Sequence, residues 1–254
     1  MAWDPQVYVR YEGERSRPFH ELVDRIGVTS PRRVVDLGCG QGTLTHDLLR
    51  RWPGAVVEGI DSSPEMIASW PVGTGVDLQV ADIADWAPSQ DTDVVVSNAA
   101  LQWVPGHPDM LRRWARGLPD GAWLAWQVPG NFGNPSHRLM RELAESPRWA
   151  RRLDGVLRHP DAVLEPDRYA QLLVDEGMSA DVWETTYQHV LVGENPVLEW
   201  VRGTALRPVL AALIPTDAAR FERDYAAALR SAYPALDGTT MFAFRRIFAV
   251  GTKP

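Results

Sequence analysis

The sequence predicts an α/β fold of the doubly wound type, in which helices cover both faces of a mostly parallel sheet. Two observations support this prediction. Short apolar segments alternate with segments of helical periodicity over roughly the first half of the chain, which is typical of parallel strands joined by helical crossovers. A glycine-rich turn also follows the first apolar segment, and sheets of this type bind ligands at the carboxyl ends of their strands.

The elements of the expected sheet follow one another in a regular order. The first helix is expected over residues 16–26, where apolar residues recur at helical spacing. Short apolar runs predict strands over 32–38, 55–61, 76–82, 92–98 and 122–128. Helices are expected between them over 43–52, 62–70 and 107–118. Ser62 and Glu65 match a capping box at the start of the second of these.

The pattern changes after residue 128. Helical periodicity predicts helices over 135–145, 166–176, 195–203 and 216–232, and two aromatic, alternating segments predict an antiparallel pair of strands over 180–190 and 240–250. We expect one domain with a seven-stranded sheet whose last strand is antiparallel. Its core covers about 27–130, 178–192 and 238–252, and a helical cap is expected over 1–26, 131–177 and 193–237.

Composition excludes several classes of function. The 254 residues carry a formal net charge of −7 and a single lysine, Lys253, which argues against a nucleic-acid partner. The sequence contains no run of about 18 apolar residues, which a membrane-spanning helix would need. We expect a cytoplasmic protein, either a monomer or a homodimer. The single cysteine, Cys39, cannot form an internal disulfide. No cluster of ligating side chains suggests a metal.

The stretch "VVDLGCGQG" places Asp36 ahead of glycines 38, 40 and 42. Glycines between a strand and a helix let backbone amides approach a ligand without interference from Cβ atoms. A phosphate-binding loop would need a lysine that this stretch lacks, and a dinucleotide fingerprint would space its glycines differently. The pattern therefore matches neither of these two motifs, and a tight turn between strand and helix without a ligand remains an alternative.

Two further acidic residues close the next two expected strands. Asp61 ends the second strand and Asp82 ends the third. Each has a purely structural interpretation, because Asp61 can cap a helix and Asp82 can stabilise a turn. Acids at three successive strand ends nevertheless favour one shared ligand at this edge of the sheet.

This D-x-G-x-G-x-G pattern resembles motif I of the class I S-adenosylmethionine-dependent methyltransferases, a family with a Rossmann-like fold. The resemblance implies that Asp36 accepts hydrogen bonds from the ammonium group of the cofactor, that Asp61 binds the ribose hydroxyls, and that Asp82 binds the adenine. The cofactor residues that it implies are Asp36, Gly38, Gly40, Asp61, Ser62, Met66, Asp82, Ile83, Asn98, Ala99 and Leu101. The product would be S-adenosylhomocysteine, and no metal is expected.

The fourth expected strand ends in "SNAALQWV". In the family this loop borders the methyl group, so Gln102 and Trp103 would face the acceptor, although Trp103 can equally be a core residue. The stretch lacks the [DN]-P-P-[YF] pattern of enzymes that methylate the exocyclic amines of bases. This absence again argues against a nucleic-acid substrate.

The resemblance is closer to one group within this family. The stretches "WDPQVYVRYEGERSRP" and "NAALQWVPGHP", together with residues 61–67, resemble the trans-aconitate 2-methyltransferases, and the similarity runs from about residue 3 to residue 250. It implies transfer of a methyl group to a carboxylate of trans-aconitate, which gives a monomethyl ester. Two alternatives remain open: another small-molecule acceptor, or a protein that binds the cofactor without catalysis.

A carboxylate acceptor needs alignment more than acid–base chemistry. It is ionised at neutral pH, so no general base is expected. A polycarboxylate should be held by arginine side chains with hydroxyl or imidazole donors. The candidate substrate residues are Tyr8, Tyr11, Arg15, Arg17, Trp103, Tyr187, His189, Arg207 and Arg246. His107 and His137 follow the fourth and fifth strands and are further candidates.

Overall fold

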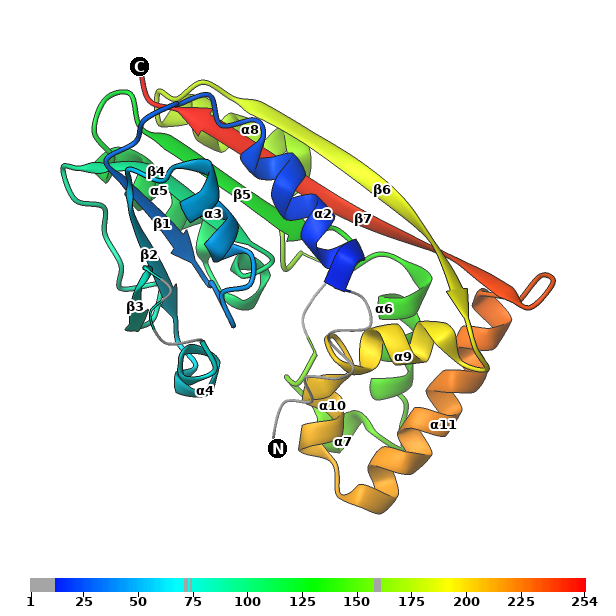
Figure 1. The fold of residues 1–254 in the computed structure, drawn as a ribbon. Helices are drawn as coiled ribbons and strands as arrows, with labels where there is room; N and C mark the ends of the chain where they lie inside the picture. The colour runs from blue at the N-terminus through cyan, green and yellow to red at the C-terminus, as the bar shows by residue number, and fades with distance from the viewer. Residues whose placement is uncertain (1–11, 71–72, 74, 158–160) are drawn as a thin grey trace. The chain divides into compact units, whose positions relative to one another are not determined.

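The computed structural model describes residues 12–70, 73, 75–157 and 161–254. The chain forms a seven-stranded sheet in the order β3-β2-β1-β4-β5-β7-β6 (Figure 1). The strands are β1 (Arg33–Leu37), β2 (Val56–Asp61), β3 (Asp77–Val80), β4 (Thr92–Asn98), β5 (Trp123–Pro129), β6 (Asp181–Val192) and β7 (Thr239–Thr252). The first five pair in parallel, and β7 is antiparallel to β5. The predicted fold class is confirmed.

The order of strands reverses beside β1, which pairs with β2 on one side and with β4 on the other. Val34, Val35 and Leu37 of this strand are fully buried, as expected for a parallel strand with helices on both faces. In doubly wound sheets, ligands bind where the order reverses, at the carboxyl ends of the strands. The carboxyl ends of β1 and β4 are therefore where a ligand site is expected.

Helices cover both faces of the parallel strands. In Figure 1, α2 (Glu12–Val23) and α3 (Thr45–Arg51) lie in front of the strands, and α5 (His107–Gly117) and α8 (Pro166–Asp175) lie behind them. The other described helical segments are α4 (Pro64–Ala68), α6 (Pro135–Ala144), α7 (Ala150–Leu153), α9 (Pro196–Arg202), α10 (Arg207–Ala212), α11 (Pro215–Ala232) and a 3-10 turn, η1 (Leu101–Trp103).

The chain divides into two compact units. One, which we call the sheet unit, comprises Gly13–Pro129, Val163–Thr185 and Arg246–Pro254. The other, the helical unit, includes Gly130–Ala162 and Thr186–Arg245. Helices α2 and α8 thus group with the sheet unit, although the sequence predicts them as parts of the cap. The functional division into a core and a cap stays a prediction.

The helical unit has its own apolar core. Its centre holds Trp149, Trp200, Phe221 and Phe242, each at most 3% exposed. Tyr225 of α11 donates its hydroxyl to the backbone carbonyl oxygen at residue 136 of α6, at 2.7 Å. A buried hydroxyl needs such a partner, because an unpaired one costs about 1–3 kcal/mol. This bond therefore holds α6 and α11 in a defined register.

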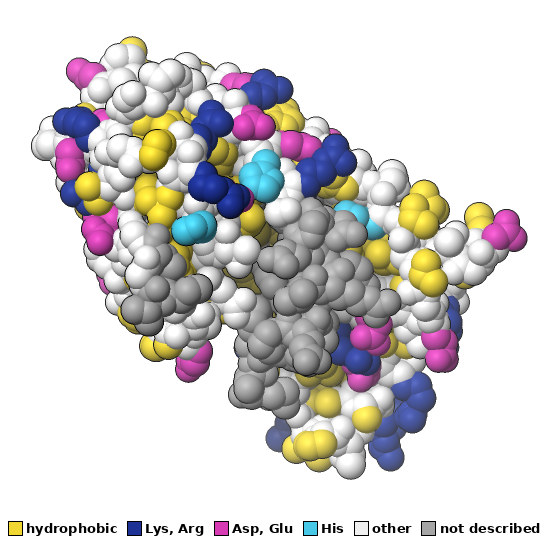
Figure 2. Space-filling model, viewed as in Figure 1, with side chains coloured by type: hydrophobic (Ala, Val, Ile, Leu, Met, Phe, Trp, Pro, Cys, Tyr) yellow, Lys and Arg dark blue, Asp and Glu magenta, His cyan; other side chains and the backbone are white. Residues whose placement is uncertain are grey.

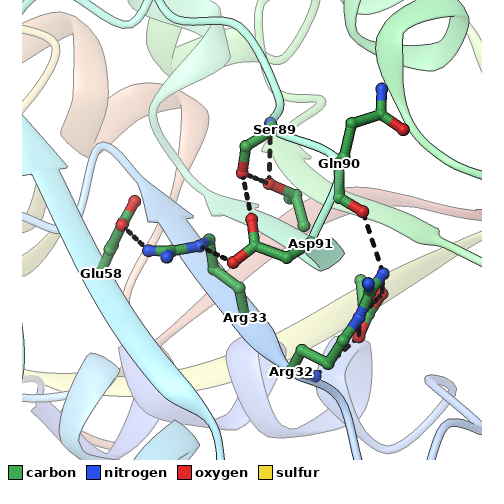
Figure 3. Close-up of polar contacts among 8 residues, drawn as sticks. Arg32, Arg33, Glu58, Ser89, Gln90 and Asp91 are labelled. Carbon is green, nitrogen blue, oxygen red and sulfur yellow. Dashed lines mark hydrogen bonds and ion pairs between the residues drawn. The ribbon is translucent and has the colours of Figure 1, made fainter.

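Charged side chains hold the amino-terminal edge of the sheet together (Figure 3). Arg33 at the start of β1 contacts Glu58 of β2 and donates to Asp91 at 3.0 Å. Its neighbour Arg32 donates to Asp93 and to the carbonyl oxygen of Gln90. This network lies at the end of the strands opposite to their carboxyl ends, so we assign it a structural role in aligning β1, β2 and β4.

Two local predictions needed correction. The cap of α4 is Ser63 and not Ser62: the Ser63 hydroxyl accepts from the Met66 amide at 3.2 Å and donates to Glu65. Pro64 then occupies the first helical position, where its missing N–H costs nothing. Helix α10 was not expected, because a segment of six residues is too short for helical periodicity to show.

Candidate functional site

The glycine turn after β1 has backbone angles that favour glycine. Gly38, Gly40 and Gly42 have φ values of +83°, +57° and +74°, which side chains disfavour. The amides of Gly38 and Cys39 both donate to the carbonyl oxygen of Ile60 in β2, at 2.8 and 3.1 Å. These two bonds hold the turn against the neighbouring strand.

The three glycines meet different surroundings. A Cβ atom at Gly38 would lie 2.2 Å from the Cβ of Ala100, and one at Gly42 would lie 1.7 Å from the ring of Trp70. A Cβ at Gly40 would meet no atom of the described residues within 4 Å. Gly38 and Gly42 thus allow close packing within the protein, whereas Gly40 leaves space that a ligand can approach.

Asp36 is the buried acid of the site, only 3% exposed. The hydroxyl of Thr45 on α3 donates to its Oδ2 at 2.5 Å. Burial raises the pKa of Asp36 from 3.8 to about 7, the Thr45 hydrogen bond opposes this shift, and the charge of Asp61 adds to it. A cation bound beside Asp36 would stabilise its ionised form.

Asp61 closes β2 beside the glycine turn. It accepts from the backbone amides of Gly40 and Ser63, both at 2.9 Å. Because an ionised carboxylate offers about four acceptor positions, two remain for ribose hydroxyls. Ser62, next to it, is exposed, and Met66 on α4 is partly buried. Asp61 therefore shapes the turn and keeps capacity for a ligand.

Asp82 is exposed beyond the end of β3. Its Oδ1 accepts from the amide of Ala84 at 2.8 Å, which is the turn role considered for it from the sequence. This bond leaves further acceptor positions on the Asp82 carboxylate. Ile83, the next residue, is buried at 6% exposure.

The segment after β4 is strained. Ala99 has a φ of +55° although it is not glycine, and its amide donates to the carbonyl oxygen of Gln127 at 2.9 Å. Its own carbonyl oxygen accepts from the side chain of Gln102 at 2.6 Å. Leu101 is fully buried, whereas Trp103 is 49% exposed and is therefore not a core residue. Strain of this kind is typical of functional loops.

The register of the sheet places several polar side chains on one face. Paired residues of neighbouring strands share a face, and side chains alternate along each strand. Asp36 pairs with Val96, so Asn98, two residues later, lies on the same face. Asn98 pairs with Gln127 of β5, and the pairing of β5 with β7 puts Arg246 on this face too. Asp61 shares the face through the pairing of β1 with β2.

The predicted cofactor residues fit an S-adenosyl nucleoside carrying an amino acid. Asp36 and Asp61 offer carboxylates to an ammonium group and to ribose hydroxyls, and Gly40 leaves space beside them. In the described part of the chain, the buried Oδ1 of Asn98 has no hydrogen-bond donor. A donor on a bound ligand would satisfy this acceptor. The roles of the individual residues stay predictions.

The substrate candidates of the sheet unit differ in their surroundings. Arg246 is 8% exposed and donates from Nη1 to Oε1 of Gln127 at 3.2 Å. Arg17 is exposed on α2 and pairs with Glu21 at 2.7 Å. Arg15 lies in α2, but its side chain is outside the described part of the structure. Tyr8 and Tyr11 lie outside the described residues altogether.

The remaining candidates belong to the helical unit. Tyr187 is 7% exposed, and its ring lies 6.3 Å from that of His189. The His189 ring packs against Trp200 at 4.4 Å. Tyr187 and His189 thus share a face, as their spacing on β6 predicts. Arg207 is exposed at the first position of α10.

Residues on the other face of the sheet unit have a structural role. His107 is 3% exposed, and its Nε2 lies 2.7 Å from the hydroxyl of Tyr169. Burial lowers the pKa of His107 to about 4, so the ring is neutral. Tyr169 packs edge-on against Trp126 of β5, which alternates with Gln127. His107 is therefore separated from Asp36 by the sheet.

The other histidine candidate, His137, belongs to the helical unit. Its ring packs on that of Phe132, with 5.4 Å between the ring centroids. Its Nδ1 lies 3.2 Å from the hydroxyl of Ser136, the preceding residue. These contacts place His137 in the packing of α6, and its role at a substrate site stays a prediction.

One residue of the polar face was missed from the sequence. Gln127 is fully buried and contacts both the loop after β4 and Arg246. The only signal was a polar residue within the apolar strand "AWLAWQV". Buried polar residues in such a position are uncommon, so this signal was available.

Three general properties of the described residues bear on function. No group of three or more His, Cys, Asp or Glu side chains among them could hold a metal ion. No helix that the structure describes is long and apolar enough to cross a membrane. On the face drawn in Figure 2, the described Lys and Arg side chains are interspersed with Asp and Glu.

Comparisons with known proteins agree with this geometry. Residues 11–177 match the family described as a methyltransferase domain. The chain is 54% identical over 250 residues to trans-aconitate 2-methyltransferase of Mycolicibacterium gilvum, and the match covers 98% of both chains. It is 52% identical over 261 residues to the enzyme of that name from Streptomyces avermitilis, with 99% of this chain and 97% of that protein covered.

A solved structure supports the same fold. The chain resembles a phosphoethanolamine N-methyltransferase 2 of Haemonchus contortus, solved with S-adenosylhomocysteine, with a TM-score of 0.55 and 15% identity. The likeness covers 94% of this chain and 52% of that one. The strand order, the acids at the strand ends and the near full-length identity lead to one conclusion: the chain belongs to the S-adenosylmethionine-dependent methyltransferases, within the trans-aconitate 2-methyltransferase family.

Proposed function

We propose that this protein transfers the methyl group of S-adenosylmethionine to a carboxylate of trans-aconitate and releases a monomethyl ester and S-adenosylhomocysteine. The observation that carries the proposal is the polar face of the sheet unit. It joins two carboxylates suited to a cationic cofactor, Asp36 and Asp61, with a buried guanidinium, Arg246, suited to an anion. The high identity to relatives of that name supports the choice of acceptor.

Asp36 and Asp61 would hold the cofactor. Asp36 would accept from its ammonium group, and Asp61 would accept from the ribose hydroxyls while it keeps the amide of Gly40 in place. Asp82, Ile83 and Met66 would border the adenine. The cofactor supplies, when bound, a methyl group that is already activated on a positively charged sulfur.

The protein then has to align the acceptor and exclude water. A carboxylate is ionised at neutral pH, since reference acids titrate near 4, so no residue has to remove a proton. Arg246 would fix one carboxylate by charge-assisted hydrogen bonds. Rate enhancement would come from bringing the carboxylate oxygen, the methyl carbon and the sulfur into line.

Other features of the proposed enzyme rest on the sequence alone. We propose a cytoplasmic enzyme without a nucleic-acid or membrane partner. We propose that it is a monomer or a homodimer. The candidate residues Arg15, Arg17, Arg207, Tyr187 and His189 stay predictions as substrate ligands.

The decisive experiment offers the purified protein S-adenosylmethionine with trans-aconitate, and separately with citrate and with an apolar phenol. Formation of the aconitate monomethyl ester together with an equal amount of S-adenosylhomocysteine is expected. Faster methylation of the phenol than of trans-aconitate would contradict the proposal and favour an apolar acceptor.

A further inference from the structure

Gln127 has two hydrogen-bonding groups with different surroundings. The side chain is fully buried. Its oxygen, Oε1, accepts from Nη1 of Arg246 at 3.2 Å, and because arginine can only donate, this contact determines which end of the amide faces Arg246. Its nitrogen, Nε2, has no acceptor among the described residues. A buried amide nitrogen without a partner is unfavourable, so a ligand that supplies an acceptor would remove a real penalty.

The neighbouring strand has the complementary unpaired group. Asn98 of β4 is the register partner of Gln127, and its Oδ1 is buried without a donor in the described part of the chain. Strands in a sheet lie about 5 Å apart. The two side chains therefore lie side by side on one face, and within the described structure one lacks a hydrogen-bond donor and the other lacks an acceptor.

The polar groups on this face change in charge across the sheet, from an acid on β1 to a cation on β7. Asp36 on β1 is an acid and Arg246 on β7 is a cation. Between them, and counting the described residues alone, Asn98 on β4 has an unpaired acceptor and Gln127 on β5 an unpaired donor. A cationic group would be favoured at the β1 and β4 end of this row. An anionic group would be favoured at the β5 and β7 end.

We infer that Gln127 is a positioning residue for the acceptor: its Nε2 donates to one carboxylate of the polycarboxylate, while its Oε1 orients the guanidinium of Arg246 toward the same anion. The inference rests on the proposed function for the identity of the acceptor. A neutral amide suits this role, because it orients Arg246 without neutralising its charge. Asn98 correspondingly accepts from the ammonium end of the cofactor, one strand away.

The test uses Gln127→Glu, which keeps an oxygen for Arg246 but replaces the donor by a negative charge. Binding of trans-aconitate to the protein saturated with S-adenosylhomocysteine is measured by calorimetry. We expect the acceptor affinity to fall about 10- to 100-fold, as for the loss of a hydrogen bond to a charged group. The preference for trans-aconitate over fumarate should fall with it, whereas the affinity for S-adenosylhomocysteine should change less than about 2-fold.

A matched control comes from the opposite face. Trp126 precedes Gln127, and its Nε1 is also buried without a partner in the described residues. Because it points away from the polar face, Trp126→Phe should leave the acceptor affinity unchanged. Thermal unfolding of each variant shows whether the fold is retained, and Gln127→Leu tests the loss of both contacts where the protein still folds.

The outcomes separate this inference from the proposed function. Unchanged acceptor affinity and unchanged preference in Gln127→Glu would overturn the inference, even if the unaltered enzyme methylates trans-aconitate. If the unaltered protein binds trans-aconitate but does not methylate it, the proposed function fails. A lower affinity of Gln127→Glu for trans-aconitate would still support the inference in that case. If the loaded, unaltered protein binds no polycarboxylate, both are overturned.

Discussion

Replacing Asp36 by asparagine should stabilise the cofactor-free protein at neutral and alkaline pH. Burial raises the pKa of Asp36 to about 7 in the folded state, from an ordinary value of 3.8. The folded protein therefore binds this proton more tightly than the unfolded chain does. The free energy of unfolding therefore keeps its full value below about pH 4. It falls by about 1.4 kcal/mol per pH unit as the pH rises from about 4 to about 7.

The magnitude follows from this window. Between pH 5 and pH 7, Asp36 is mostly protonated in the folded protein and ionised in the unfolded chain. The loss of this proton on unfolding should reduce the free energy of unfolding by about 2 kcal/mol over this interval. Asp36→Asn does not titrate, so its stability relative to the unaltered protein should rise by about that amount over the same interval. Urea unfolding at pH 5, 6, 7 and 8 measures both proteins.

The control is Asp120→Asn, at an exposed turn outside the site. It shows what the same substitution does to unfolding where the side chain is not buried. A difference between Asp36→Asn and the unaltered protein that does not depend on pH would refute the reasoning that burial penalises this charge. Asp36→Asn should also bind S-adenosylhomocysteine more weakly at pH 8, since the ammonium group loses its counter-charge. The site thus exchanges stability for binding.

Three further predictions concern the turn and the opposite face of the sheet. Asp61→Ala removes the carboxylate that accepts from the Gly40 amide and would accept from the ribose hydroxyls. Calorimetry should therefore show an affinity for S-adenosylhomocysteine about 10- to 100-fold lower. An unchanged affinity would mean that Asp61 only caps the turn. Gly42→Ala places a Cβ 1.7 Å from the ring of Trp70 and should lower the free energy of unfolding, measured in urea, by about 2 kcal/mol or more. In Gly40→Ala the new Cβ meets no described atom within 4 Å, so the free energy of unfolding should fall by less. Tyr169→Phe removes a buried hydroxyl with two hydrogen bonds and should cost about 1–3 kcal/mol without changing cofactor affinity in calorimetry.

The cofactor side of the site could be predicted because its signals are local. Asp36 and the glycines lie within one short stretch of sequence, and a strand followed by a glycine turn places them whatever the rest of the chain does. Asp61 was predicted for the same reason, since it ends a recognisable strand. The helix cap was assigned to Ser62 when the structure uses Ser63, because neighbouring serines offer the same chemistry to a pattern.

The acceptor side could be predicted only in part. Arg246 was a candidate, but alternation along β7 could not say whether it or its neighbour Arg245 faced the polar side. That choice depends on the pairing of β5 with β7, two strands that lie far apart in the sequence. Gln127 gained its importance from the same pairing, and sequence periodicity does not contain it.

The sequence by itself determined the α/β fold, the order of its elements and the acids that close the strands, because hydrophobic periodicity and glycine turns act over a few residues. The tertiary structure alone decided which of these side chains share one face. It buried Asp36 and raised its pKa, placed Asn98 beside Gln127, and brought Arg246 to the same row. The physical reason is that strand register and burial are set by contacts between distant segments, and these contacts determine the electrostatics of the site.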